Sequence, residues 1–235
     1  IIEKTSNIMS SNIVVSRQDD TKILDKIQKN IENNSAKKII FSKNYNYKIN
    51  QDGFLYEDQY GSLQLPKPRL LGEHQISNTA CAVSAIRNLK KYKIKNEHIV
   101  EGIKSMKNMR GRLETINRGS LKKLAPTNTI ICDIAHNPSA GLVISKYLNT
   151  LSKNKKIYMI CGMMNNKIHE EFIANFKQIS EIIAVDLPNN KNCIKKEDLK
   201  KIIEKIGIKT NTKNSIQEAI KYLANKDKNS IILIS

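Results

Sequence analysis

The chain has 235 residues, with 40 lysines and arginines against 22 acidic residues and a formal net charge of +18. Hydrophobic residues make up 40% of it, enough for one large domain or two small ones with a buried core. No stretch approaches the roughly 18 apolar residues of a membrane span, and the first residues hold no cleavable apolar block. We therefore expect no membrane partner and no signal peptide.

The basic excess makes nucleic-acid binding one hypothesis for this chain. The distribution of the charge favours a different interpretation. Only six of the basic residues are arginines, and the lysines are spread along the whole chain among isoleucines and asparagines. No basic stripe interleaved with aromatic residues is present. We predict solvated faces covered with lysine and no nucleic-acid partner.

The cysteines are scattered singly and form no CxxC pair, which argues against a zinc site built on thiolates. They are Cys81, Cys132, Cys161 and Cys193. Free, isolated cysteines are typical of a reduced compartment, so we expect a cytoplasmic protein.

The first part of the chain mixes short apolar runs with periodic segments. NIVVS at 12–16 is an apolar run, 19–34 has helical periodicity, and KKIIFS at 37–42 predicts a strand. Asp52-Gly53 is a turn dipeptide that predicts paired strands around it, and two prolines within 66–70 end the region. The segments 72–89 and 96–107 predict helices.

From residue 129 onward, apolar runs alternate regularly with helical segments. The runs are 129–135, 156–163, 181–188 and 230–235, and the helical segments are 138–151, 168–177, 196–206 and 215–225. Strands that are continuously apolar and alternate with helices predict a mainly parallel sheet covered on both faces. The fold class is therefore α/β, with a doubly wound, Rossmann-like domain whose ligands bind outside the carboxyl ends of the strands.

The stretch CDIAHNP at 132–138 lies at such a carboxyl end. Pro138 suits the first position of a helix and Asn137 suits its N-cap, so the helix start would favour an anion. Asp133 and His136 would flank that point. From spacing alone, an active-site edge and a plain capped turn with a solvated histidine are equally supported.

Two further motifs have both a functional and a structural interpretation. Gln75 and Asn78 stand three residues apart at a helix start, which by itself favours a polar turn. Arg112 follows a glycine in the loop GRLE, where its guanidinium could hold phosphate oxygens or form a surface ion pair. The four histidines have no metal-ligand spacing, and neither GxxxxGK[ST] nor GxGxxG occurs in these residues.

In series, LLGEHQISNTACA, GRLE, CDIAHNP and CGMMNNK resemble the folylpolyglutamate synthases, including the bifunctional dihydrofolate synthases of the Mur ligase superfamily. The resemblance covers nearly the whole chain but only the later part of the family's length. It implies that 1–107 is the remainder of an ATPase domain and 108–235 a glutamate-ligase domain. The implied reaction is ATP-dependent ligation of L-glutamate to a folate or dihydropteroate carboxylate through an acyl phosphate.

The resemblance also implies roles for single residues, with ATP and Mg²⁺ as cofactors. Asn78 would bind the adenine, Arg112 the phosphates and Asp133 the ribose. His136 would lie beside the glutamate and acyl-phosphate site, with Asn137 and the helix start holding anionic oxygens. Lys4 falls where the family places a carbamylated lysine that binds Mg²⁺.

The chain departs from the family pattern at several places. Ile134 takes the middle position of the family's D-G/N-AHNP, Met109-Arg110 replaces Trp-Pro, and Asn166-Lys167-Ile168 replaces Asp-Lys-Asp. No P-loop occurs, and the first residue is not methionine, so we expect part of a longer protein or a partner chain that carries the P-loop. The alternatives are an inactive remnant of a split or decaying gene and a related Mur-type amino-acid ligase.

Overall fold

The computed structural model describes residues 12–107, 109–151 and 155–235. The chain divides into two compact units, Ile1–Lys107 and Asn108–Ser235. Among the described residues, the first unit holds two small sheets and the second holds one larger sheet.

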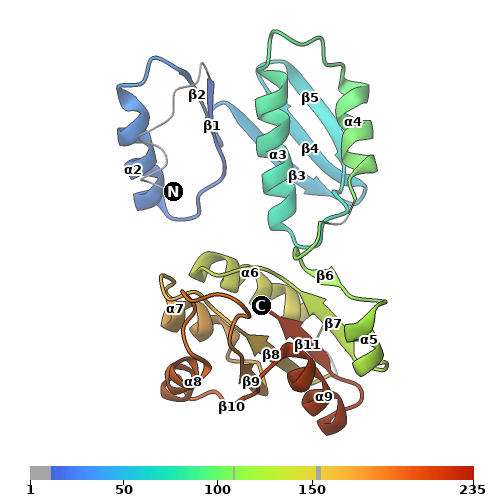
Figure 1. Cartoon of the computed structure of the whole chain (residues 1–235). Coiled ribbons are helices and arrows are strands. Elements are labelled where there is room, and N and C mark those ends of the chain that lie inside the picture. The colour runs from blue at the N-terminus through green and yellow to red at the C-terminus, as the bar shows by residue number, and fades with distance from the viewer. Residues whose placement is uncertain (1–11, 108, 152–154) are drawn as a thin grey trace. The chain divides into compact units, whose positions relative to one another are not determined.

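The first unit begins with a small parallel layer (Figure 1). Strands β1 (Asn12–Val15) and β2 (Lys37–Ile40) pair in parallel, and helix α2 (Thr21–Glu32) connects them. The side chain of Asp20 caps α2 by accepting a hydrogen bond from the Lys22 amide. One face of the layer packs on α2 and forms a small core of Ile13, Val15, Ile27, Ile31 and Ala36.

An antiparallel meander follows, made of β3 (Tyr45–Asn50), β4 (Gly53–Asp58) and β5 (Gly61–Pro66). Helices α3 (His74–Arg87) and α4 (Asn96–Ser105) pack against it. The core between them holds Phe54, Tyr56, Leu65, Ala80, Val83, Ile99 and Ile103.

The turn of the first hairpin lies one residue earlier than the turn dipeptide suggests. Asn50 pairs with Gly53, so Gln51 and Asp52 form the two-residue turn and Gly53 opens β4. At Gly53 φ is +155°, and an added Cβ would collide with the Leu65 carbonyl oxygen. The glycine is therefore required by the close approach of β5 rather than by the turn itself.

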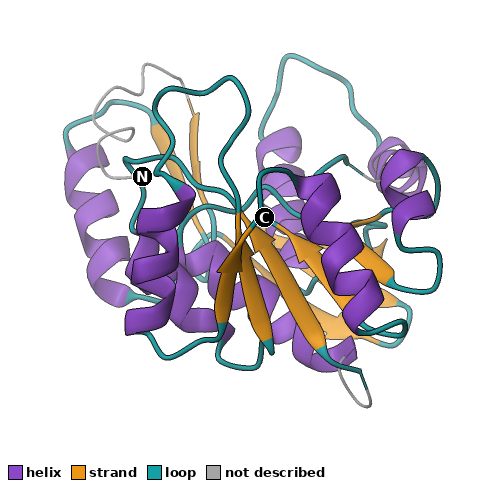
Figure 2. Ribbon diagram, turned by 60° about the horizontal axis from the view of Figure 1, so that its bottom comes forward, coloured by secondary structure: helices purple, strands orange, loops and turns teal. Residues whose placement is uncertain are grey.

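The second unit is built on a six-stranded sheet of order β10-β9-β8-β11-β7-β6 (Figures 1 and 2). Its parallel strands are β7 (Thr129–Cys132), β8 (Ile157–Cys161), β9 (Glu181–Ala184), β10 (Thr210–Thr212) and β11 (Ile231–Ile234). The edge strand β6 (Glu114–Thr115) runs antiparallel to β7. The helices are α5 (Ser120–Leu124), α6 (Pro138–Leu151), α7 (His169–Ile173), α8 (Lys196–Lys205) and α9 (Ile216–Lys226), with the 3₁₀ turn η1 (Ala174–Phe176).

Each strand of this sheet sends alternate residues to opposite faces, as strand geometry requires. Ile131 and Met159 face a core shared with α6, α7 and α8, whereas Ile130 and Ile160 face one shared with α5 and α9. Burial on both faces explains why the strands read as unbroken apolar runs. The predicted α/β class with a doubly wound, mainly parallel sheet is confirmed.

The observed elements differ from the predicted segments mainly at their ends. Helix α6 has the predicted bounds, but the strands stop one to four residues before their apolar runs end. After β7, for example, Asp133 binds the Ala135 amide and turns the chain out of the sheet. The sequence pattern does not predict strands β6 and β10, because each is only two or three residues long and all of their residues are polar.

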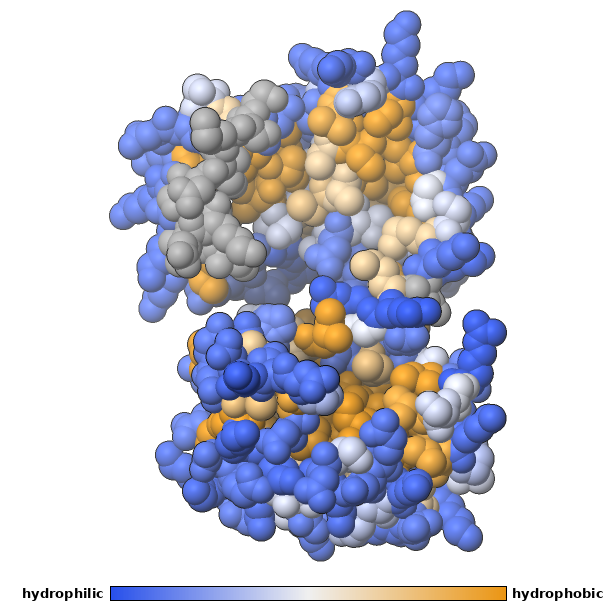
Figure 3. Space-filling model, viewed as in Figure 1, coloured by the Kyte–Doolittle hydropathy of each residue, from blue (hydrophilic) through white to orange (hydrophobic). Residues whose placement is uncertain are grey.

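The surface agrees with the composition. In Figure 3 hydrophilic side chains border both units, and apolar side chains are visible between these hydrophilic ones. Within the described ranges, no helix has the length and apolar character needed to cross a membrane.

Candidate functional site

A cavity of about 410 Å³ opens at the carboxyl ends of the parallel strands in the second unit. It is lined by residues that end or directly follow β7, β8, β9 and β11, together with Ile216 at the start of α9. This is the edge where open α/β sheets bind ligands. Its walls are mostly apolar, and Asp133, His136 and Lys167 bring ionisable side chains to it.

Asp133 holds two loops together at this edge. Its Oδ2 accepts a hydrogen bond from the Leu113 amide and its Oδ1 one from the Ala135 amide, both at 2.8 Å. The residue is only 7% exposed. Each carboxylate oxygen keeps one lone pair that a ligand could use. In the folded chain, however, both oxygens already accept hydrogen bonds from buried backbone amides.

The loop that carries Arg112 is fixed on both sides of that residue. The Gly111 carbonyl oxygen accepts a hydrogen bond from the Ile134 amide, and the Leu113 amide binds Asp133. Gly111 has φ +67°, and an added Cβ would lie 2.7 Å from the Ile134 side chain. The Arg112 side chain is exposed and has no ion pair or side-chain hydrogen bond within the described residues. In that part of the chain, the surface ion pair that was one of the two interpretations of Arg112 is therefore not formed, and a hydrogen-bonded loop presents the guanidinium.

The loop from His136 into α6 has the predicted helix start. Asn137 Oδ1 accepts a hydrogen bond from the Ala140 amide at 3.0 Å, so Asn137 caps the helix and Pro138 is its first residue. The exposed His136 ring places Nδ1 3.0 Å from the Ile134 carbonyl oxygen. A carbonyl oxygen only accepts, so Nδ1 carries the proton and Nε2 of the neutral ring can accept one.

Asn78 belongs to the first unit, where it lines a groove of about 410 Å³ between α3 and α4. Apolar side chains gather over these two helices in Figure 3. The Asn78 amide donates to Gln75 Oε1 at 3.3 Å, and Gln75 is buried. The two amides are therefore a linked polar pair in a groove whose lining is mostly apolar.

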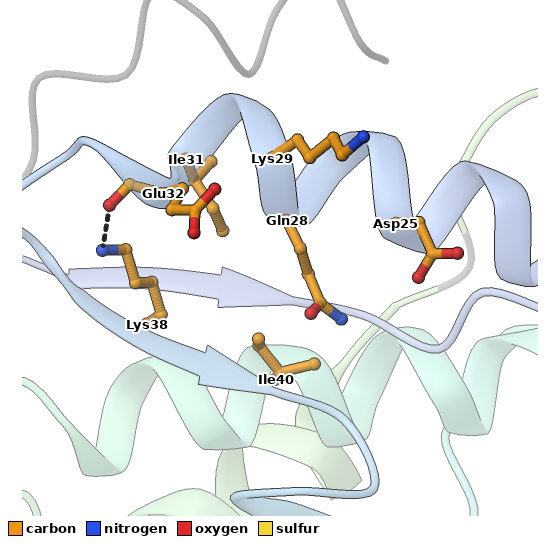
Figure 4. Close-up of a pocket in the computed structure, with 7 residues that line it drawn as sticks. All are labelled: Asp25, Gln28, Lys29, Ile31, Glu32, Lys38 and Ile40. Carbon is orange, nitrogen blue, oxygen red and sulfur yellow. Dashed lines mark hydrogen bonds between the residues drawn. The ribbon is translucent and has the colours of Figure 1, made fainter.

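A third hollow, of about 540 Å³, lies between α2 and β2 (Figure 4). Its rim carries charges of both signs from Asp25, Lys29, Glu32 and Lys38, and Lys38 Nζ donates to the Glu32 backbone oxygen at 2.9 Å. It contains none of the predicted site residues, so we assign it no function.

The predicted metal ligand Lys4 lies outside the described residues. In the ranges that are described, no cluster of three or more histidine, cysteine or acidic residues could hold a metal ion. The described residues therefore do not by themselves form a Mg²⁺ site.

Two cavity residues were given no role by the sequence motifs. Cys132 lines the cavity, but burial and then the charges of Glu114 and Asp133 raise the pKa of its thiol, which keeps it protonated and poorly nucleophilic. Lys167 also lines the cavity. Lys167 is the last residue of the CGMMNNK motif, and this place shortly after the run that becomes β8 was the signal that could have given it a role.

The family model described as "Mur ligase, glutamate ligase domain" matches residues 111–235. The UDP-N-acetylmuramate–L-alanine ligase of Clostridium acetobutylicum is 25% identical over 201 residues, which cover 81% of this chain and 42% of that protein. The dihydrofolate synthase/folylpolyglutamate synthase of Buchnera aphidicola is 29% identical over 201 residues, covering 73% and 43%. The chain thus spans less than half the length of these relatives.

Solved structures share the fold. Escherichia coli FolC in complex with DHPP and ADP aligns with a TM-score of 0.72 at 20% identity, covering 89% of this chain and 47% of that one. Mycobacterium tuberculosis folylpolyglutamate synthase complexed with ADP and AMPPCP aligns at 0.71 and 18% identity, covering 94% and 51%. With its glutamate ligase domain matched from Gly111 to the last residue, the chain belongs to the Mur ligase family.

Proposed function

We propose that this chain provides the amino-acid side of an ATP-dependent ligase that joins L-glutamate to a folate or dihydropteroate carboxylate. One observation carries the proposal. In a Mur ligase glutamate ligase domain, three groups adjoin the carboxyl edge of the sheet: the Arg112 side chain, which has no partner among the described residues, the His136 ring and the N-terminus of α6. The relatives named as folylpolyglutamate synthases support glutamate and a folate as the substrates.

The chemistry of such a ligation is dominated by negative charge. When bound, ATP supplies the phosphoryl group that turns the substrate carboxylate into an acyl phosphate. Arg112 would hold phosphate oxygens with its planar fork, and the start of α6, capped by Asn137, would favour anionic oxygens. Stabilising charge that develops during the reaction is usually the largest contribution of such a site.

His136 would act on the nucleophile. An ammonium group cannot attack an acyl phosphate until it loses a proton. With Nδ1 donating to the Ile134 carbonyl oxygen, Nε2 can accept that proton from the glutamate amine. Asp133 fixes the Arg112 loop beside the turn that carries His136 and could in addition accept a ribose hydroxyl.

The first unit would serve the nucleotide base. An adenine ring has apolar faces and polar edges, which suits the groove between α3 and α4 with Gln75 and Asn78 as its polar pair. We propose Asn78 as the adenine ligand.

The remaining parts of the site would come from another polypeptide segment. Parallel sheets normally bury both faces and have several strands, yet β1 and β2 form a two-stranded sheet among the described residues. We propose that a P-loop-bearing segment, on the same or a separate chain, extends this sheet and brings the Mg²⁺ ligands, with Lys4 as one of them.

The test is to supply a P-loop-bearing half from a folylpolyglutamate synthase and to measure glutamate-dependent ADP formation with a dihydropteroate or folate acceptor. We expect activity that depends on both halves, and Arg112→Ala and His136→Ala should each lower it about a hundredfold. Unchanged rates in both variants would show that Arg112 and His136 do not have the proposed roles in ligation. ATP binding by the mixture without ligation would instead favour an inactive remnant.

A second candidate substrate is supported by the alanine ligase relative. At 25% identity over most of this chain, it keeps open a Mur-type ligase that adds a different amino acid to a different carboxylate. The same assay with L-alanine and UDP-N-acetylmuramate in place of L-glutamate and the folate acceptor distinguishes the two.

A further inference from the structure

Glu114, the last residue of GRLE, accepts a hydrogen bond from its own loop. It opens β6, where it pairs with Cys132 of β7. Its Oε2 accepts from the Gly111 amide at 2.9 Å, and the residue is half-buried. The side chain thus reaches back past Arg112 to the residue that precedes it. This contact gives the acid of the motif a direct connection with the backbone that carries Arg112.

The backbone on either side of Arg112 has a left-handed conformation. The φ angle is +67° at Gly111 and +47° at Leu113. Glycine adopts this region freely, whereas leucine does so only at a cost in free energy. The Leu113 side chain is buried in the core shared with α6, α7 and α8. Because such a conformation persists only where surrounding contacts hold it, the contacts of this loop determine where Arg112 points.

The loop is held from two directions. On one side lies the turn after β7, where the Ile134 amide donates to the Gly111 carbonyl oxygen at 3.0 Å. The same turn carries Asp133, which accepts from the Leu113 amide at 2.8 Å. On the other side, Glu114 binds the Gly111 amide. Gly111 is buried, so among the described residues its amide would have no acceptor if Glu114 were removed.

The same hydrogen bonds relate Arg112 to His136. Ile134 joins them, because its amide binds the Gly111 carbonyl oxygen and its own carbonyl oxygen lies 3.0 Å from His136 Nδ1. Glycine would otherwise allow the loop to turn about Gly111, and a bond to its amide removes that freedom. Groups that are already oriented need no rearrangement when the reaction develops charge.

Glu114 leaves the guanidinium of Arg112 available. Within the described residues no ion pair joins the two side chains, although they are only two residues apart. A carboxylate bound to the guanidinium would compete with phosphate oxygens for the same planar set of donors. By binding a backbone amide instead, Glu114 can fix the loop without occupying Arg112.

We propose that Glu114 is a positioning residue, which holds the Gly111 amide so that Arg112 is presented in one direction beside His136. The inference rests on the proposed function, because that function gives Arg112 a phosphate to bind. The hydrogen bond itself belongs to the folded chain and can be tested without a reaction.

The first test compares Glu114→Gln with Glu114→Met by NMR of the 235-residue chain. Glutamine keeps an oxygen that can accept from the Gly111 amide and removes the charge, whereas methionine removes both. We expect amide exchange at Gly111 to be about tenfold faster in Glu114→Met and nearly unchanged in Glu114→Gln. The backbone order parameter of Arg112 should fall in the methionine variant alone.

The matched control is Glu171→Met. It removes an exposed glutamate of α7 whose side chain has no partner in the described ranges. We expect its exchange and order parameters in the GRLE loop to equal those of the unmodified chain.

The second test measures kcat in the two-half ligase assay. Glu114→Met should lower kcat about tenfold, since Arg112 would be less well oriented, and Glu114→Gln should keep most of it. In an Arg112→Ala background Glu114→Met should cause no further loss, because a residue that acts through Arg112 has no effect without it. A role in stability alone would add its loss to that of Arg112→Ala.

Three results would overturn the proposal. The first is unchanged exchange at Gly111 and unchanged order at Arg112 in Glu114→Met. The second is an equal loss of kcat in the glutamine and methionine variants, which would assign the charge of Glu114 to a ligand or a metal. The third is an additive loss in the double variant, in which case the reaction remains and this assignment fails. If the two halves produce no amide, the proposed reaction fails, and the NMR comparison alone decides whether Glu114 holds the loop.

Discussion

Arg87 in the first unit and Arg112 in the second unit have opposite surroundings. In the first unit, the guanidinium of Arg87 is enclosed by its own chain, with Nε 2.9 Å and Nη2 3.0 Å from the two Asp58 oxygens. The side chains are 8% and 3% exposed, and the Arg87 guanidinium carbon lies 5.7 Å from the ring centres of Tyr56 and Tyr60. In the second unit, Arg112 and Lys167 have no such partners within the described residues.

This difference separates charges that hold the fold from charges that are left for a ligand. A buried ion pair with full hydrogen bonding positions its elements, in this case α3 against the end of β4. A cation without a partner contributes nothing to the folded state, so its presence at a cavity needs another reason. Stability measurements can test each side of the comparison.

The largest effect is expected for Arg87→Met in the first unit. Methionine keeps much of the aliphatic bulk but leaves the Asp58 carboxylate buried without a cation. Removing one partner of a buried pair costs about 3–5 kcal/mol. We expect the free energy of unfolding, measured by urea titration with amide exchange along α3 as the local probe, to fall by this amount.

Arg112→Gln is the matched control, because it removes an arginine that has no partner in the described ranges. We expect its free energy of unfolding to change by less than about 0.5 kcal/mol, as is usual for exposed sites. Equal losses in the two variants would mean that Arg112 is held by the fold, which would contradict the comparison.

A smaller loss is expected for Asp133→Ala, the acid that joins the two loops in the second unit. The change leaves the Leu113 and Ala135 amides without their acceptor in a site that is 7% exposed. Unsatisfied buried donors cost about 1–3 kcal/mol each, and partial access of water should keep the total near 2–3 kcal/mol. Faster amide exchange at Leu113 and Ala135 would identify the cause.

Asp133→Asn separates the structural from the nucleotide role of this residue. The asparagine amide has one acceptor oxygen and can serve only one of the two backbone donors, so roughly half of the loss should remain. If Asp133→Asn is as stable as the unmodified chain, the two hydrogen bonds do not hold the loops.

The fold of the second unit could be predicted because each of its main strands and helices has more than one feature in the sequence that indicates it. Buried parallel strands such as 157–161 are apolar throughout, and helices such as α6 have both a cap and a period. Edge strands lack that redundancy. Strand β10 (Thr210–Thr212) pairs with β9 through backbone hydrogen bonds, and its side chains show no apolar pattern that would predict a strand.

The candidate site could be predicted only in part, for a related reason. Asn137 and Pro138 act locally, so their positions in the sequence are sufficient to identify the helix start. Asp133 is defined by its contact with the Leu113 amide, twenty residues away in the chain. Lys167 is identified by its place among the residues that line the cavity, which come from several strand ends. Neither property can be read from neighbouring residues.

Among the contacts that hold the fold, the Asn137 cap should give the smallest loss of stability, and this residue also adjoins the proposed anion site. Asn137→Ala removes the cap on the Ala140 amide and should lower the free energy of unfolding by about 1 kcal/mol. Asn137→Asp keeps an acceptor there and adds a negative charge that the helix N-terminus favours, so stability should stay the same or rise slightly. The same charge would repel an anionic ligand, so the affinity for L-glutamate, measured by titration followed by amide NMR shifts, should fall. If Asn137→Asp leaves that affinity unchanged, the start of α6 caps a helix and takes no part in binding.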